Sequence, residues 1–86
     1  MEQINYTVTD KNGIHARPAG LLVQASRQYS SEIRMKKGDR SADCKKLFQV
    51  MQLGVRSGDE ITVTAEGKDS GEALRELEKT LREAGL

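Results

Sequence analysis

Apolar and polar residues alternate in several short stretches of this chain. Ile4, Tyr6 and Val8, for example, are separated by polar residues. A period of two is typical of a strand with one buried face. The sequence Lys37-Gly38-Asp39 separates two such stretches and predicts a hairpin turn. The pattern therefore predicts four strands, at residues 4–8, 32–36, 40–42 and 61–65.

Elsewhere the apolar residues recur at helical spacing. They predict three helices, at about residues 16–29, 45–53 and 69–84. In the first helix the apolar face is predicted to consist of Ala19, Leu22, Val23 and Ser26, widened by Leu21 and Ala25. In the third helix the stripe consists of Ala73, Leu74, Leu77, Leu81 and Ala84.

Local residue types predict where the helices begin and end. Asp43 is expected to cap the second helix, and Gly54 suits the position just after it. Asp69, followed by Glu72 three residues later, resembles a capping box at the start of the third helix. Gly20 has no evident role inside the first helix, where glycine costs about 1 kcal/mol relative to alanine. Close approach of another backbone or of a partner protein would be a reason for it.

The predicted element order is βαββαβα. Strands with one apolar face need a covering layer, and the three helices can supply it. We therefore expect an α+β fold, an open-faced β-sandwich in which helices cover one side of a four-stranded antiparallel sheet. A chain of 86 residues predicts a single domain spanning residues 1–86.

Composition narrows the functional classes. Fourteen basic and 13 acidic residues give a net charge of +1, which argues against a dedicated nucleic-acid-binding protein. The apolar runs are too short for a membrane span, and the N-terminus does not resemble a signal peptide. A single cysteine cannot form an internal disulfide. We therefore expect a cytoplasmic protein, most simply a monomer.

The chain's single histidine lies where the first strand gives way to the first helix. His15 is followed by Arg17 and by Pro18, the only proline. The first turn of a helix has unpaired amides and a partial positive charge, and therefore binds anions. Here the backbone amides of Ala16 and Arg17 would bind the anion. An isolated histidine is usually a solvated loop residue, but a guanidinium suited to phosphate and a junction of this kind favour a histidine that carries a phosphoryl group.

The segment Gly13-Ile14-His15-Ala16-Arg17-Pro18-Ala19 resembles the active-site motif of the HPr family. These proteins are the histidine phosphocarriers of the phosphoenolpyruvate-dependent sugar phosphotransferase system. The resemblance extends over the whole chain. Further matching positions are Leu22-Val23, Ser31-Glu32-Ile33, Lys45, Leu47, Leu53-Gly54 and Ala65-Glu66-Gly67.

The resemblance implies the predicted fold and a function. His15 would accept a phosphoryl group on Nδ1 from phosphorylated Enzyme I and pass it to sugar-specific Enzyme IIA domains. Arg17 would stabilise the phosphate. The covalent phosphate on His15 needs no other cofactor, and one Cys with one His falls short of a metal-ligand set. Such a carrier differs from a turnover enzyme, so whether it should be called an enzyme stays open.

The resemblance also implies a docking surface on the second helix, beside His15. The candidate docking residues are Leu47, Phe48, Met51, Gln52, Gln24, Arg27, Lys45 and Lys46. From the pattern alone, Leu47 and Val50 are predicted to be core residues, whereas Phe48 and Met51 are expected to be partly exposed. The basic residues could form a rim that speeds encounter with acidic partners.

Lys46 departs from the family pattern. In many members this position is a serine that a regulatory kinase phosphorylates, and a lysine cannot be that acceptor. The main alternative to a carrier is an HPr-like regulatory module that controls carbon or nitrogen metabolism by binding other proteins. A more distant alternative is a small anion-binding domain without a transfer role.

Overall fold

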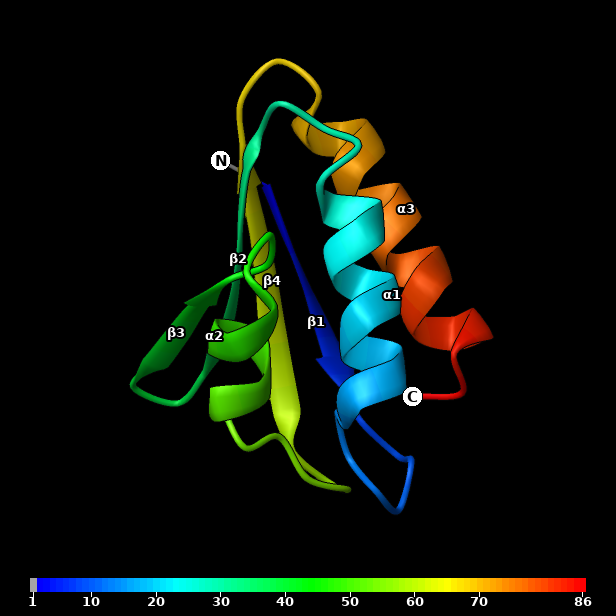
Figure 1. Cartoon of the computed structure of the whole chain (residues 1–86). Coiled ribbons are helices and arrows are strands. Elements are labelled where there is room, and N and C mark those ends of the chain that lie inside the picture. Colours follow the sequence, from blue (N-terminus) through cyan, green and yellow to red (C-terminus); the bar gives the residue numbers. More distant parts are fainter. Residues whose placement is uncertain (1) are drawn as a thin grey trace.

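The computed structural model describes residues 2–86, and its element order is βαββαβα (Figure 1). The order agrees with the prediction. The elements are β1 (Glu2–Thr7), α1 (Ala16–Ser26), β2 (Glu32–Lys37), β3 (Arg40–Asp43), α2 (Leu47–Gln52), β4 (Glu60–Glu66) and α3 (Ser70–Glu83).

The four strands form one antiparallel sheet in the order β1-β4-β2-β3. β4 lies between β1 and β2, and its Val63 is paired with Ile4 on one side and Met35 on the other. The predicted inward residues of β2 and β4 are buried, as the alternation requires. Ile4 and Tyr6 are only partly buried because β1 is an edge strand, and Val8, just beyond it, is fully buried.

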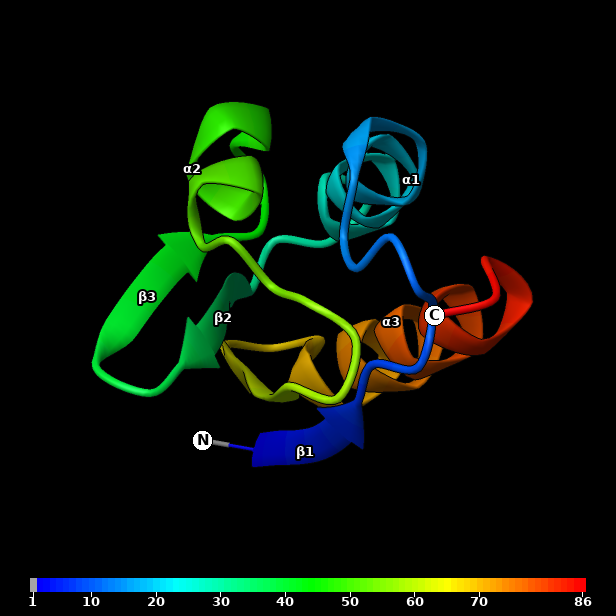
Figure 2. The ribbon, with the colours of Figure 1, turned by 90° about the horizontal axis from the view of Figure 1, so that it is seen from below.

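All three helices lie on one side of the sheet (Figures 1 and 2). Helix α3 presents the predicted leucines to the core, and Leu77 and Leu81 have no exposed surface. Burying a leucine side chain contributes about 1.5–3 kcal/mol, so this stripe fixes α3 against the sheet. No helix of residues 2–86 covers the opposite face of the sheet, which makes the architecture an open-faced β-sandwich (Figure 2).

Helix α1 is shorter than predicted, ending at Ser26 rather than near Tyr29. The amides of Gln28 and Tyr29 donate to the carbonyls of Ala25 and Ser26, three residues back. Such bonds tighten the chain into a turn and end the α-helical pattern. The apolar Tyr29 still packs on the core, which is why the periodicity continues beyond the helix.

Helix α2 begins at Leu47, two residues later than predicted, with Lys46 in extended backbone conformation at the N-cap. The prediction that Asp43 caps this helix is wrong. The Asp43 carboxylate accepts a hydrogen bond from the Lys45 amide at 2.9 Å, an Asx turn that precedes the helix. At the other end Gly54 has φ 66°, the left-handed conformation expected of the residue after a helix.

The predicted capping box at α3 is also wrong. Asp69 is the N-cap residue, but its carboxylate makes no capping bond. It accepts hydrogen bonds from the amides of Ser30 and Ser31 and from the Ser31 hydroxyl, at the start of β2. The Ser31 hydroxyl and then the Ser30 amide lower the pKa of Asp69 to about 2. Because the pKa is lowered, the hydrogen bonds to the ionised Asp69 carboxylate stabilise the fold fully above about pH 4. This stabilisation is lost as the pH falls through 2.

Candidate functional site

The loop that carries His15 is fixed by backbone contacts. The Gly13 amide donates to the Asp10 carbonyl, and the Ile14 amide donates to the Val55 carbonyl. Gly13 has φ 62°, and a Cβ atom there would lie 2.1 Å from the Val55 oxygen. Only glycine allows this turn and this close approach together. The loop that follows α2 therefore fixes the position of the residues just before His15.

His15 is the N-cap residue of α1, in extended backbone conformation (φ −97°). Its side chain is 41% exposed, so another protein can reach the ring. The Nε2 atom lies 3.8 Å from Oδ2 of Asp10. A carboxylate on this side of the ring favours a proton on Nε2 and leaves the lone pair on Nδ1, the other nitrogen.

Two backbone amides at the start of α1 have no hydrogen-bond acceptor among residues 2–86. These are the amides of Ala16 and Arg17; Pro18 has no N–H, and the Ala19 amide donates to the His15 carbonyl. The first turn carries no acidic residue that would compete for them. The junction therefore has the unpaired amides and the helix dipole that an anion site needs.

Arg17 lies in this first turn, and its side chain is exposed. Within the described residues its guanidinium makes neither an ion pair nor a hydrogen bond. Its five donors are therefore available to an incoming anion. The structure thus brings together His15, the two amides and Arg17 in one accessible place.

A hollow of about 440 Å³ lies next to this turn, between α1 and α2. We call it the α1/α2 hollow. Its lining residues are Ala16, Arg17, Gly20, Leu21, Val23, Gln24, Arg27 and Leu47. Three candidate docking residues, Gln24, Arg27 and Leu47, are among them. Gln52 lies instead on another side of α2, where it lines a smaller hollow with Arg40 and Ser41.

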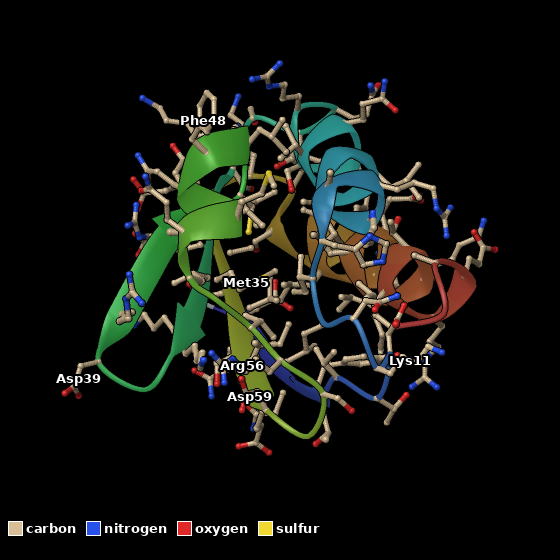
Figure 3. The ribbon with its side chains drawn as sticks, turned by 60° about the horizontal axis from the view of Figure 1, so that its bottom comes forward. Lys11, Met35, Asp39, Phe48, Arg56 and Asp59 are labelled. Atoms are coloured by element: carbon tan, nitrogen blue, oxygen red, sulfur yellow. The ribbon has the colours of Figure 1, made fainter. Side chains whose placement is uncertain are left out.

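Most apolar side chains of α2 are unusually exposed for residues of their type. Phe48 is 78% exposed, and Figure 3 shows its ring on the outer side of α2, away from the sheet. Met51 is 39% exposed, and the expectation of partial exposure holds for both residues. The prediction that Leu47 belongs to the core is wrong, since it is also 39% exposed. Only Val50 of this short helix is buried, because six residues can turn only one narrow face inward.

The basic docking candidates differ in whether their side chains already make hydrogen bonds within the protein. The Lys45 ammonium donates to the Tyr29 carbonyl at 2.7 Å, and the Lys45 carbonyl accepts from Nε of Arg27 at 3.0 Å. Lys45 is partly buried and joins the end of α1 to the segment before α2. Lys46 is exposed and makes no side-chain contact of this kind in residues 2–86.

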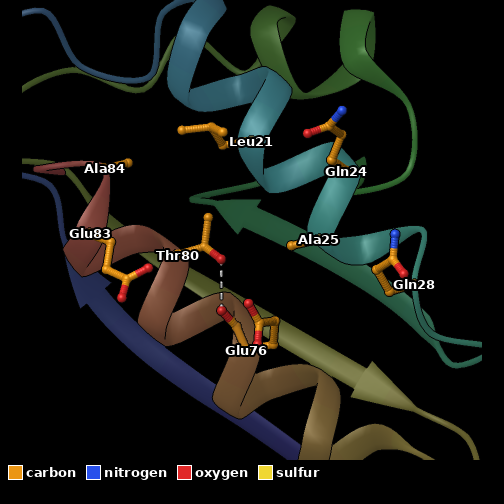
Figure 4. Close-up of a pocket in the computed structure, with 8 residues that line it drawn as sticks. All are labelled: Leu21, Gln24, Ala25, Gln28, Glu76, Thr80, Glu83 and Ala84. Carbon is orange, nitrogen blue, oxygen red and sulfur yellow. Dashed lines mark hydrogen bonds between the residues drawn. The ribbon is translucent and has the colours of Figure 1, made fainter.

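A second hollow, of about 480 Å³, lies on the other side of α1, against α3 (Figure 4). We call it the α1/α3 hollow. It shares Leu21 and Gln24 with the first, and α3 contributes Glu76, Thr80 and Glu83. The Thr80 hydroxyl donates to the Glu76 carbonyl, so it is already paired.

The comparisons with known proteins decide the family. The family model described as the phosphorylation site of the PTS HPr component matches residues 2–83. The chain belongs to the HPr family. Its fold is that of the family's phosphocarriers, and the recognition made from the His15 motif is confirmed.

Solved structures of family members are very similar to this chain. The histidine-containing phosphocarrier protein of a mycoplasma is 30% identical, with a TM-score of 0.97 over 99% of this chain and 97% of that one. The phosphocarrier protein HPr of Bacillus anthracis is 35% identical, with a TM-score of 0.84 over 92% and 94%. Crh, the catabolite repression protein of Bacillus subtilis, is 35% identical as a domain-swapped dimer, with a TM-score of 0.77 over 100% and 99%.

No helix of residues 2–86 has the length and apolar character needed to cross a membrane. No three His, Cys, Asp or Glu side chains gather there in a way that could hold a metal ion.

Reasoning from the sequence missed two parts of the site. Asp10 belongs to the stretch Asp10-Lys11-Asn12-Gly13, whose residue types predict a turn, and its carboxylate faces the imidazole. A turn signal gives no indication of the direction of a side chain. Leu21 was assigned to the buried face of α1, but it is 37% exposed and lines both hollows. In the sequence, the one indication of this exposure is that Leu21 lies at the margin of the apolar face of α1.

Proposed function

We propose that this protein is a phosphocarrier that accepts a phosphoryl group on His15 from phosphorylated Enzyme I and passes it to Enzyme IIA domains. The observation that supports this best is the geometry of His15. An exposed imidazole caps a helix whose first two amides are unpaired and whose first turn carries a free guanidinium. The phosphotransferase system works on the cytoplasmic side, and we place this protein there.

In the transfer, the Nδ1 lone pair of neutral His15 attacks the phosphorus in line with the bond to the donor. The new N–P bond forms as the bond to the donor breaks. The leaving group of the donor takes up a proton, and the phosphorylated His15 ring can release its Nε2 proton, so charge and protons balance. The amides of Ala16 and Arg17 and the Arg17 guanidinium lie close to where the added negative charge develops. The Asp10 carboxylate, 3.8 Å from Nε2, favours a proton on that nitrogen, which supports Nδ1 as the nucleophile.

The same arrangement suits release of the group. The site is shallow and open, so phosphohistidine stays exposed to the next acceptor. A site that bound the intermediate as tightly as the transition state would slow the second transfer. Pro18, which is buried, fixes the start of α1 and has no role in the chemistry.

The test is incubation with phosphoenolpyruvate and purified Enzyme I, followed by intact mass measurement. We expect one added phosphate that is lost in acid and is absent from the His15→Ala protein. Because His15 is a partly exposed cap without a side-chain hydrogen bond, that variant should remain folded, as circular dichroism can check. A folded wild-type protein that takes up no phosphate would rule out the carrier function.

The similarity to Crh supports a second candidate, a regulatory module that binds other proteins of carbon metabolism. Lys46 weighs against the form of this function that depends on a serine kinase, since a lysine cannot accept the phosphate. Phosphorylation of His15 by Enzyme I without any transfer to Enzyme IIA domains would favour this second candidate.

A further inference from the structure

A lysine stands at a position of β2 where the alternation calls for an apolar residue. Ile33 and Met35 are fully buried, and Lys37 follows at the next position on the same face of the strand. Its side chain is only 30% exposed, whereas the neighbouring Lys36, on the opposite face, is exposed. The end of β2 therefore directs a cationic side chain to the side of the sheet that carries the helices.

The partners of Lys37 lie at the two ends of one loop, residues 54–59 between α2 and β4, which we call the α2/β4 loop. The Lys37 ammonium donates to the Gly54 carbonyl at 2.8 Å and lies 3.0 Å from Oδ2 of Asp59. The same carboxylate oxygen accepts a hydrogen bond from the Arg56 amide at 2.8 Å (Figure 3). The Arg56 amide and then Lys37 lower the pKa of Asp59, so the ion pair is present at neutral pH. One ammonium group therefore holds both ends of the loop.

The chain that leads to His15 lies against this loop. The Val8 amide donates to the Asp59 carbonyl at 2.9 Å, and the Ile14 amide donates to the Val55 carbonyl at 3.1 Å. Figure 2 shows the α2/β4 loop passing from α2 to the segment between β1 and α1. The position of the residue just before His15 therefore depends on where the Val55 carbonyl is held.

We propose that Lys37 is a positioning residue for phosphoryl transfer. It joins the ends of the α2/β4 loop and so fixes the Val55 carbonyl, which fixes Ile14. Through Ile14 it fixes how the His15 ring is held relative to the unpaired amides of α1. An error of about 1 Å in such a placement can slow a reaction about 10²-fold. This inference rests on the proposed carrier function, and it concerns a side chain that lines neither hollow beside α1.

The test is Lys37→Met, which keeps an apolar stem and removes the ammonium group. Rapid-quench measurement of transfer from phosphorylated Enzyme I, over a range of concentrations of this protein, gives a maximal rate and a half-saturating concentration. We expect the maximal rate to fall about fivefold with the half-saturating concentration unchanged, because the ring is less often in the reactive geometry while docking is intact. Lys37→Arg, which keeps the charge and several donors, should restore most of the rate.

Hydrogen exchange supplies a readout that does not depend on activity. In Lys37→Met the bond from the Ile14 amide to the Val55 carbonyl should open more often, so the Ile14 amide should exchange several-fold faster than in the wild type. The Leu77 amide, inside α3, is the internal reference. Its exchange should change little, because a partly exposed ion pair contributes little to global stability.

Lys36→Met is the matched control. Lys36 is the next residue of β2 and carries the same charge, but within residues 2–86 its side chain makes no hydrogen bond or ion pair. This variant should leave both kinetic constants and the exchange of the Ile14 amide unchanged. The control separates positioning from the loss of a positive charge.

The outcomes separate the two proposals. Absence of phosphate uptake by the wild-type protein would contradict the carrier function itself. Normal uptake by the wild type with an unchanged maximal rate in Lys37→Met would overturn the inference alone. A higher half-saturating concentration at an unchanged maximal rate would also overturn it, since Lys37 would then act in docking. Equal acceleration of exchange at Ile14 and Leu77 would overturn it as well, since the effect would then be one of global stability.

Discussion

Helix α1 has a hollow on each side, and the two differ in charge rather than in size. The α1/α2 hollow measures about 440 Å³ and the α1/α3 hollow about 480 Å³. Leu21 and Gln24 line both. The first has Arg17 and Arg27 at its margins, whereas the second has Glu76 and Glu83 (Figure 4).

The comparison shows that charge and location, rather than volume, separate the two hollows. The α1/α3 hollow lies beside carboxylates, which would repel a phosphorylated partner with acidic groups. The α1/α2 hollow begins at the turn that contains the free amides and Arg17, next to His15. Location next to His15 and a positive margin make the α1/α2 hollow the better candidate for docking the phosphoryl donor of the proposed function.

The largest effect should come from the arginine at the margin next to His15. Arg17→Ala removes the guanidinium closest to the transferred group, and we expect phosphoryl transfer to slow by about 10²-fold or more. Rapid-quench measurement of phosphate transfer from Enzyme I would test this. Glu83→Gln, in the α1/α3 hollow, is the control and should leave the rate unchanged. If the two variants slowed phosphoryl transfer equally, the proposed difference between the hollows would be contradicted.

An intermediate effect is expected from the exposed aromatic residue of α2. Phe48→Ala should weaken docking by about 30-fold, since an aromatic contact at the centre of an interface is worth about 2 kcal/mol. Its side chain is already in solvent, so thermal stability should change little. Titration calorimetry with Enzyme I would measure the affinity, and Gln28→Ala in the α1/α3 hollow is the control. Unchanged affinity would remove Phe48 from the docking surface.

The smallest effect concerns long-range attraction. Lys46→Ser should reduce the rate of transfer two- to threefold at low salt and flatten its dependence on ionic strength, because exposed charges act mainly on encounter. The exposed Lys79 of α3 provides the control, as Lys79→Ser. If Lys46→Ser kept the salt dependence of the wild type, Lys46 would have no part in steering.

The fold was predictable because its strands follow a simple rule. Ile33, Met35, Ile61, Val63 and Ala65 occupy alternate positions and are all fully buried. The location of His15 at a strand-to-helix junction follows from the same patterns, and the free amides follow from helix geometry.

The errors concern side chains whose partners are distant in the sequence. Asp69 has the local signature of a cap. Its carboxylate oxygens instead accept hydrogen bonds from the amides of Ser30 and Ser31, which lie 39 and 38 residues away in the sequence. Asp43 forms a turn instead of a cap because its carboxylate accepts its hydrogen bond from the Lys45 amide, which lies before the start of α2. A local signature cannot reveal which of several donors the fold brings closest.

Exposure was the least predictable property. Leu21 and Leu47 have the residue type of core positions, yet both face the hollow where a partner would cover them. A leucine buried by its own protein and one buried by another are equivalent in sequence. Only the three-dimensional arrangement of α1 and α2 distinguishes them.

The single thiol has a practical consequence. Cys44 is fully buried, and burial raises its pKa to about 12. Because the thiolate is the reactive form, only roughly one molecule in 10⁵ would carry it at neutral pH. We therefore expect the native thiol to react only slowly with alkylating reagents and mild oxidants, so that a cysteine newly placed on the surface could be modified with a dye without removing the natural one.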